Sequence, residues 1–212
     1  MALKDNKIKS IIVDFVNYFN NNSIPYVLIG GLAVNIWGRI RTTMDADFII
    51  DQSKLDIEEF LAYLQERKYE ITSQDMINGL NERINITIWS GIFRVDLKGI
   101  YNSFAKKSIE MAHKIKLFNV EVKVDSPELL IISKLCYGSE QDFEDAASIF
   151  LRLKNQNRLN LDFLKDLIEV LNINDRLNLL ESLINKNITV EHLENEIDDL
   201  RTFNFDLLDS NF

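Results

Sequence analysis

The sequence has few of the residues that cross-link or interrupt a chain. Its 212 residues include one cysteine, Cys136, which excludes an internal disulfide, and neither His113 nor His192 stands in a spacing typical of zinc ligands. No apolar run approaches the roughly 18 residues of a membrane span, and the N-terminus lacks the basic and then apolar layout of a secretory signal. We therefore expect a protein of the reducing cytoplasm with no membrane partner.

Basic residues are also in the minority. The chain has 24 Lys+Arg against 33 Asp+Glu, a formal net charge of −9, so its overall field repels polyanions. A nucleic acid would have to be held by a local basic patch, such as one formed by Lys106, Lys107, Lys114 and Lys116, or by metal ions. Much of the acidity lies in Glu191 to Asp209, which we interpret as a solvated helical face.

The composition is that of a globular protein, with 46% hydrophobic and 27% charged residues. Apolar residues recur with helical spacing from Ile8 to Phe19, and β-prone runs alternate with turn residues up to about residue 125. We predict strands at 26–29 and 48–50, a helix over 57–64 capped by Ser53, and hairpins at 84–97 and 114–124. Pro127 stands at a typical first helical position, and we predict helices over 127–137, 141–154, 161–171, 174–185 and 190–200. The fold class is therefore α/β (α+β), with a mixed-sheet core at 1–125 and a helical domain at 126–212.

Three carboxylates in the first half of the sequence are candidate metal ligands. Asp45 and Asp47 are two residues apart at the start of an apolar strand, so both project from the same face of a sheet. Carboxylates this close repel each other unless a cation lies between them, and Mg²⁺ is held by such oxygens together with substrate phosphates. An isolated Asp-x-Asp is also common in solvent-facing turns. Asp96, on the charged face of another predicted strand, completes a metal site or pairs with Arg94 or Lys98.

A glycine pair lies upstream of these carboxylates. Gly30-Gly31 follows a strand and precedes a helix, a place where backbone N–H groups can approach a phosphate. The glycine patterns of P-loop and Rossmann proteins are absent. Arg39 and Arg41 follow, and a guanidinium there binds a triphosphate or pairs with Asp45.

Read in order, Gly30-Gly31-x-Ala33-x4-Gly38-x2-Arg41-x-Thr43-x-Asp45-x-Asp47 is far rarer than its parts. It resembles the signature of the nucleotidyltransferase superfamily, which has the polymerase beta-like fold, over about residues 24 to 150. The long interval between the glycines and the aspartates looks like that of the AbiEii-type type IV toxin nucleotidyltransferases. Aminoglycoside and lincosamide nucleotidyltransferases are similar more distantly.

The resemblance continues into the second half. Lys134 and the run Gln141-Asp142-x-x-Asp145 are similar to a lysine-bearing helix and a Lys-Asp-x-x-Asp helix of the toxin-like proteins, although Gln141 stands where those have a cation. The resemblance implies roles for nine residues. These are Asp45, Asp47 and Asp96 as catalytic metal ligands, with Asp96 as candidate base; Gly30, Gly31, Arg41, Thr43 and Lys134 as nucleotide-binding residues; and Asp142 as a supporting residue. A helix-to-helix ion pair is the alternative for Lys134 and Asp142.

The implied activity is transfer of a nucleoside monophosphate from a nucleoside triphosphate (NTP) to a hydroxyl group, with two Mg²⁺ ions. The acceptor is tRNA or another macromolecule in a toxin–antitoxin setting, with an antitoxin protein as partner, or it is a small molecule. The alternative is a catalytically silent member that binds a nucleotide or a partner protein. Among the remaining residues, we expect Trp37, Trp89 and Cys136 to be buried in the core.

Overall fold

The computed structural model describes residues 2–185 and Leu208, so the helix predicted over 190–200 and the acidic run from Glu191 lie outside the described residues, apart from Leu208. The helices are α1 (Ala2–Asn21), α2 (Gly30–Trp37), α3 (Ile57–Glu66), α4 (Ser73–Glu82), α5 (Ser103–Glu110), α6 (Pro127–Tyr137), α7 (Glu140–Lys154), α8 (Leu161–Val170) and α9 (Asn174–Ile184). The strands are β1 (Tyr26–Ile29), β2 (Asp45–Ile50), β3 (Ile86–Ser90), β4 (Phe93–Gly99), β5 (His113–Leu117) and β6 (Val120–Val124). A short 3-10 turn, η1, covers Gln52–Lys54.

These elements belong to two compact units. The first comprises residues up to Ala33 together with 42–125, and the second comprises 34–41 together with the described residues from Ser126 onward. The helix α2 is shared, because its first four residues belong to the first unit and its last four to the second.

The first unit is built on one mixed six-stranded sheet with the order β3-β4-β2-β1-β6-β5. The central strands β2 and β4 are parallel, β1 runs antiparallel to β2, and β6 is parallel to β1. The outer strands β3 and β5 are added by hairpins with β4 and β6. Chain segments far apart in the sequence therefore become neighbours at the centre of the sheet.

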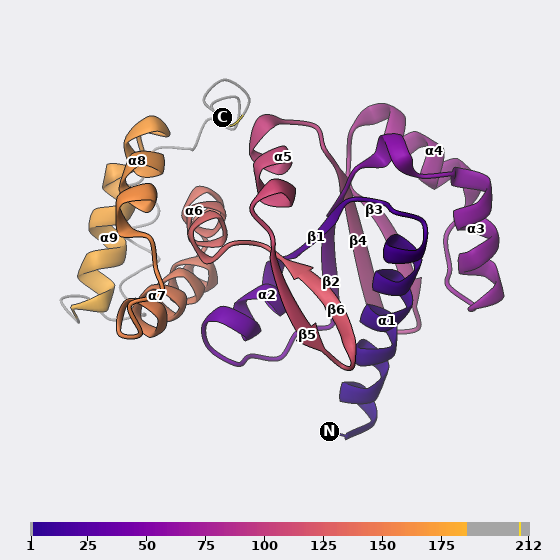
Figure 1. Cartoon of the computed structure of the whole chain (residues 1–212), viewed down its shortest axis with the longest axis horizontal. Coiled ribbons are helices and arrows are strands. Elements are labelled where there is room, and N and C mark those ends of the chain that lie inside the picture. The colour runs from indigo at the N-terminus through magenta and orange to yellow at the C-terminus, as the bar shows by residue number, and fades with distance from the viewer. Residues whose placement is uncertain (1, 186–207, 209–212) are drawn as a thin grey trace. The chain divides into compact units, whose positions relative to one another are not determined.

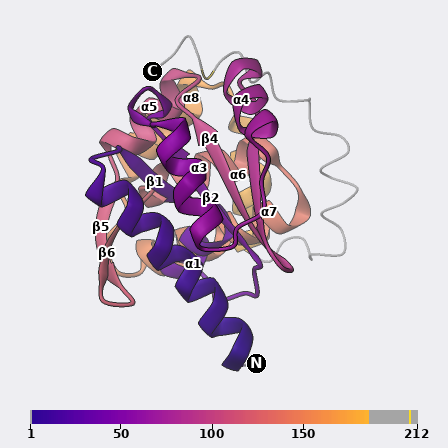
Figure 2. The same cartoon turned by 90° about the vertical axis from the view of Figure 1, so that its right-hand side faces the viewer.

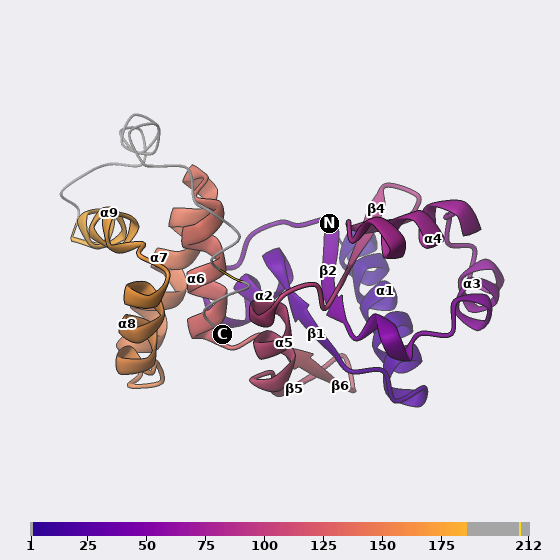
Figure 3. The ribbon, with the colours of Figure 1, turned by 90° about the horizontal axis from the view of Figure 1, so that it is seen from above.

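One face of the sheet is covered by aromatic residues. The helices α1 and α3 lie across this face, as Figures 2 and 3 show. Phe15 of α1 is fully buried, stacks on Phe48 of β2 at 6.2 Å, and meets Phe60 of α3 edge to face at 6.0 Å. Phe19 and Tyr26 extend the same cluster. Burial of these rings stabilises the packing of the helices on the sheet.

The opposite face is only partly apolar. Val27 of β1 and Ile49 of β2 pack against Ala105 of α5, which lies on the other side of the sheet from α1 in Figure 3. Further along β2 the same face carries Asp45 and Asp47, because residues 45, 47 and 49 alternate with the buried residues of the aromatic side. The charged part of this face is therefore held in place by a hydrophobic core on the other side.

The second unit is helical. Ser126 caps α6 with Pro127 in the first turn, and α6 ends at Gly138 in a left-handed conformation. Ser139 and Asp142 then form a reciprocal capping box that starts α7. Figure 1 shows α6 to α9 packed on one another, and none of the described helices is long and apolar enough to cross a membrane.

Most predicted elements are confirmed, including both hairpins and the helices over 127–137 and 174–185. The cap predicted at Ser53 is wrong, because Ser53 lies in η1 and the side chain of Asp56 accepts from Glu59 N at 3.0 Å to begin α3. Trp37 and Cys136 are buried as expected, and burial raises the pKa of the Cys136 thiol to about 12. Trp89 is not in the core: it is 44% exposed, because it alternates with the buried Ile88 on the edge strand β3.

Replacing Phe15 by alanine tests the aromatic cluster. We expect F15A to lower the free energy of unfolding by about 3–5 kcal/mol, since a fully buried ring is removed from between two helices and the sheet. Ile92→Ala, at a 58% exposed side chain, is the control and should change stability by less than about 0.5 kcal/mol. Urea unfolding measures both, and equal small effects would contradict the described packing.

Candidate active site

Two aspartates face each other across the central strands. In the parallel pairing of β2 with β4, Asp47 is the register partner of Asp96, and Asp45 is the partner of Arg94. Residues at every second position project from one face of a sheet, so all four side chains share the face that α5 covers in part. The expected grouping of Asp45, Asp47 and Asp96 is therefore what this register produces.

Arg94 contacts two of the three carboxylates. Its Nη2 lies 3.0 Å from Oδ2 of Asp45, and its Nε lies 3.0 Å from Oδ2 of Asp96. The Nε–H is buried but is not aligned on any acceptor among the described residues, so the contact with Asp96 is an ion pair without a hydrogen bond. The pairing of Asp96 with Arg94, one of the two alternatives that the sequence left open, is present.

Asp96 is also fixed from the neighbouring strand. The Thr87 hydroxyl donates to Oδ1 of Asp96 at 2.7 Å, since Thr87 of β3 is the register partner of Asp96. Asp96 is 8% exposed, and each of its oxygens has a contact. Its side chain is therefore the best-held of the three carboxylates.

Asp47 is held differently. No side chain or backbone group of the described part of the chain donates a hydrogen bond to its carboxylate. Burial and the nearby charge of Asp96 raise the pKa of Asp47 to about 6, with a smaller contribution from Asp45, while Lys98 and Arg94 act in the opposite direction. A half-buried carboxylate with this environment is stabilised in its ionised form by an added cation.

The glycine turn lies directly against this carboxylate. Ile29, the last residue of β1, is the register partner of Asp47, and Gly30 follows with a φ of +65°. A Cβ at Gly30 would lie 2.7 Å from Cγ of Asp47 and overlap its Oδ2, so both conformation and space require glycine here. Gly31 is the second residue of α2. The start of α2 thus borders Asp47.

Thr43 lies immediately before the strand that carries the aspartates. Its Oγ1 accepts from Asp45 N–H at 3.3 Å, which orders the entry to β2. Six of the nine predicted site residues lie in the first unit. They are Thr43, Gly30, Gly31, Asp45, Asp47 and Asp96.

The other three predicted residues lie in the second unit, around a buried aspartate. Asp145 of α7 is fully buried and lies 3.0 Å from Nη2 of Arg41, 3.2 Å from Nε of Arg39 and 3.4 Å from Nζ of Lys134. Lys134 also donates to Asp142 at 2.6 Å, which is the helix-to-helix ion pair considered from the sequence. Because a buried carboxylate is costly without cations, Asp145 keeps these basic side chains close to it.

Three contacts were not predicted from the sequence. They are the pairing of Asp145 with basic side chains, the hydrogen bond from Thr87 to Asp96, and the contact of Arg94 with two aspartates. Asp145 had a signal, since it ends the Asp142-x-x-Asp145 pattern. Thr87 could have been found by counting back from the hairpin turn at Ser90-Gly91, which places it opposite Asp96. The bridge made by Arg94 had no such signal, because it depends on the register between β2 and β4, strands that are far apart in the sequence.

The carboxylate oxygens of Asp45, Asp47 and Asp96 are the type of ligand that a hard divalent cation such as Mg²⁺ binds. Carboxylate oxygens are what Mg²⁺ prefers, and Asp47 has a raised pKa and no donor among the described residues. The arrangement is less complete, because the described residues contain no group of three or more acidic, histidine or cysteine side chains close enough together to hold a metal ion. Arg94 stands at two of the three carboxylates instead.

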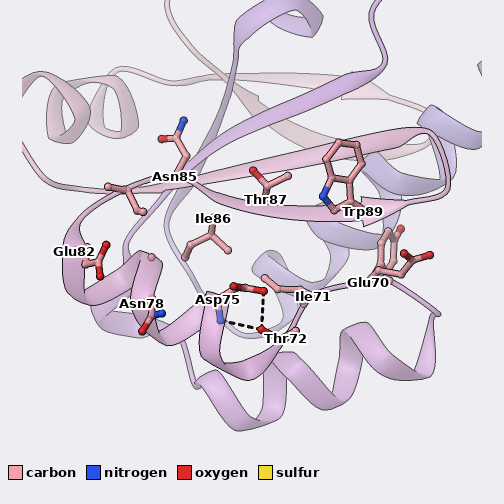
Figure 4. A pocket seen from close by; sticks show the side chains of 13 residues that line it. Glu70, Ile71, Thr72, Asp75, Asn78, Glu82, Asn85, Ile86, Thr87 and Trp89 are labelled. Atoms are coloured by element: carbon pink, nitrogen blue, oxygen red, sulfur yellow. Dashed lines mark hydrogen bonds between the residues drawn. The ribbon is translucent and has the colours of Figure 1, made fainter.

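A cavity of about 770 Å³ lies beside the edge strand β3 (Figure 4). It is bounded by α4, by residues 69–72 and by the stretch from Ile84 to Trp89. Its charged lining residues are all acidic, namely Glu70, Asp75 and Glu82. Thr87 lines it as well, so one side chain joins the cavity wall to Asp96.

The mixed sheet aligns Asp47 with Asp96, and the glycine turn closes over Asp47, as the resemblance to nucleotidyltransferases leads us to expect. Solved structures agree on the fold. An antigenic nucleotidyltransferase-like protein from Paracoccidioides brasiliensis is similar with a TM-score of 0.51 and 15% identity, over 91% of this chain and 93% of that one. ANT(2'')-Ia in complex with adenylyl-2''-tobramycin is similar with a TM-score of 0.50 and 13% identity, over 76% and 94%.

A family model described as "Nucleotidyltransferase of unknown function (DUF6036)" matches residues 6–201. The chain belongs to this nucleotidyltransferase family. No curated protein sequence matches it significantly.

The raised pKa of Asp47 gives a prediction for stability. The ordinary pKa is 3.8 and the folded value about 6, so the folded state binds the proton more tightly than the unfolded state. Stability therefore falls as pH rises from about 4 to about 6, and the full cost is present above 6. Because asparagine has no charge to bury, we expect Asp47→Asn to be more stable than the parent by about 1–3 kcal/mol at pH 7 in EDTA.

The measurement is urea unfolding of both proteins between pH 3.5 and 7.5. The gain from D47N should shrink as the pH is lowered below 6 and should disappear near pH 3.5. A gain that is constant with pH, or a variant less stable at pH 7, would show that the Asp47 carboxylate is not destabilised by its surroundings.

Proposed function

We propose that this protein transfers a nucleoside monophosphate from an NTP to a hydroxyl group of an acceptor, with Mg²⁺ as the cofactor. The observation that supports this most is the alignment of Asp47 with Asp96 across parallel strands, with Gly30 closed over Asp47. Membership of a nucleotidyltransferase family supports it independently. The acceptor oxygen attacks the α-phosphorus, its proton is removed, and pyrophosphate leaves.

The residues of the first unit would divide this work. Asp45, Asp47 and Asp96 would hold the divalent ions. The resemblance stated from the sequence implies two such ions. A bound Mg²⁺ supplies charge stabilisation for the triphosphate and lowers the pKa of the attacking hydroxyl. Asp96, oriented by Thr87, is the proposed base that takes the hydroxyl proton.

Backbone groups at the start of α2 would meet the phosphates. Gly30 and Gly31 bring the backbone N–H groups of the first turn of α2 to the border of Asp47, and Thr43 orders the entry to β2. Arg41, Lys134 and Asp142 lie in the second unit and are paired around Asp145 there. Their contact with the nucleotide stays a prediction.

The cavity beside β3 favours a small acceptor over RNA. Its volume is in the range of small-molecule pockets, and its acidic lining would repel a polyanion such as tRNA. The wall residue Thr87 connects it to Asp96. We therefore propose a small hydroxyl compound as acceptor. The toxin role with an antitoxin partner, suggested by the resemblance to AbiEii-type proteins, is the second candidate for the biological setting.

Release of pyrophosphate tests the proposed reaction. The protein should release it from at least one NTP in the presence of Mg²⁺ and a pool of small hydroxyl compounds. Asp47→Asn should lower the rate about 100-fold or more, equivalent to roughly 3 kcal/mol of barrier, because a carboxylate next to the reacting phosphate is lost.

The matched control is Asp166→Asn, an exposed aspartate of α8, which should keep the parental rate. Isothermal titration with ATP and Mg²⁺ separates the alternative. Nucleotide binding without pyrophosphate from any NTP or acceptor, RNA included, would favour a catalytically silent member of the family and count against the proposal.

A further inference from the structure

The guanidinium of Arg94 stands between Asp45 and Asp96. It reaches Oδ2 of each at 3.0 Å, because Arg94 is the register partner of Asp45 and precedes Asp96 by two residues on the same face of β4. A divalent ion shared by the cluster would take its ligands from the same carboxylates. The positive charge of Arg94 beside these carboxylates repels such an ion and competes with it.

Arg94 makes one hydrogen bond to the aspartates, from Nη2 to Oδ2 of Asp45 at 3.0 Å. Its Nε–H has no aligned acceptor among the described residues, and its side chain is 38% exposed. By contrast, the other oxygen of Asp96 is held by a short hydrogen bond from Thr87. One hydrogen bond to Asp45 and one ion pair to Asp96 therefore hold Arg94, and partly exposed ion pairs are readily exchanged.

The charge balance of the cluster points the same way. Asp45, Asp47 and Asp96 carry three negative charges when ionised, and Arg94 carries one positive charge. One divalent ion together with Arg94 neutralises the cluster. A second divalent ion without the added charge of a nucleotide would leave the cluster positive.

We propose that Arg94 is a resident counter-cation that competes with divalent ions for Asp45 and Asp96, and that it limits the cluster to one divalent ion, at Asp47, until a nucleotide is bound. The inference rests on the proposed function only in taking the three aspartates as ligands of a divalent ion. Arg94 preserves the arrangement of the carboxylates without metal, and it weakens their affinity for metal.

Titration of the full chain with Mn²⁺ in the absence of nucleotide tests this, by calorimetry and by the loss of free-ion signal in electron paramagnetic resonance. The parent should bind one ion. Arg94→Gln should bind Mn²⁺ at least tenfold more tightly, because a competing positive charge is removed from the ligand oxygens. Arg94→Lys keeps the charge but lacks the planar fork that reaches both aspartates, so its gain should be smaller.

Arg67→Gln is the matched control. Arg67 has a similarly exposed side chain, 35% against 38%, and pairs with Glu66 at a distance of 2.8 Å on α3, away from the cluster. It should bind Mn²⁺ as the parent does. If R94Q does not fold, the test is made with R94K. For each Arg94 variant that folds, adding Mn²⁺ should raise the melting temperature by more than it does for the parent.

Three results would overturn the inference: unchanged or weaker Mn²⁺ binding by the Arg94 variants, two ions bound by the parent without nucleotide, or no Mn²⁺ bound by any variant. The same samples are assayed for pyrophosphate release, which separates the two proposals. If R94Q binds Mn²⁺ more tightly but the parent releases no pyrophosphate, only the proposed function is contradicted. If the parent releases pyrophosphate but R94Q binds Mn²⁺ with the affinity of the parent, only the inference about Arg94 is contradicted.

Discussion

Repulsion among three carboxylates on two adjacent strands is the constraint on which the first unit depends. Asp45, Asp47 and Asp96 project from the same face because β2 and β4 pair in parallel with Asp47 opposite Asp96. Arg94 offsets part of the repulsion, while Asp47 keeps a pKa raised to about 6. The carboxylates therefore destabilise the folded state by repelling one another, and an added cation would relieve this repulsion. Such local destabilisation is typical of functional sites.

The rest of the first unit holds that arrangement in place. The aromatic cluster around Phe15 and Phe48 packs on the opposite face of the same strands, so residues adjacent in sequence alternate between the core and the site. Gly30 lets the chain turn closely over Asp47, and Thr87 fixes Asp96 from the edge strand. In the second unit, buried Asp145 gathers Arg39, Arg41 and Lys134 in a similar balance of charge.

Local sequence signals were enough for the strands, the hairpins and the start of α6 at Pro127, because period-two patterns and turn residues act over short distances. The helices α4 and α5 escaped prediction, since Ser73–Glu82 and Ser103–Glu110 are short and carry few apolar residues. The three carboxylates Asp45, Asp47 and Asp96 were proposed as site residues from their pattern, and the register of β2 with β4 places them on one face of the sheet. The bridge of Arg94 and the donor role of Thr87 depend on strand register, which a single sequence does not specify.

The central claim is that these carboxylates hold a divalent ion beside the nucleotide. Anomalous diffraction from crystals grown with Mn²⁺ and a non-hydrolysable NTP analogue tests it most directly. The account predicts a manganese peak within coordination distance, roughly 2.0–2.3 Å, of an Asp47 oxygen and of a phosphate oxygen. A bound nucleotide with no manganese at Asp47, or manganese only at other carboxylates, would contradict it.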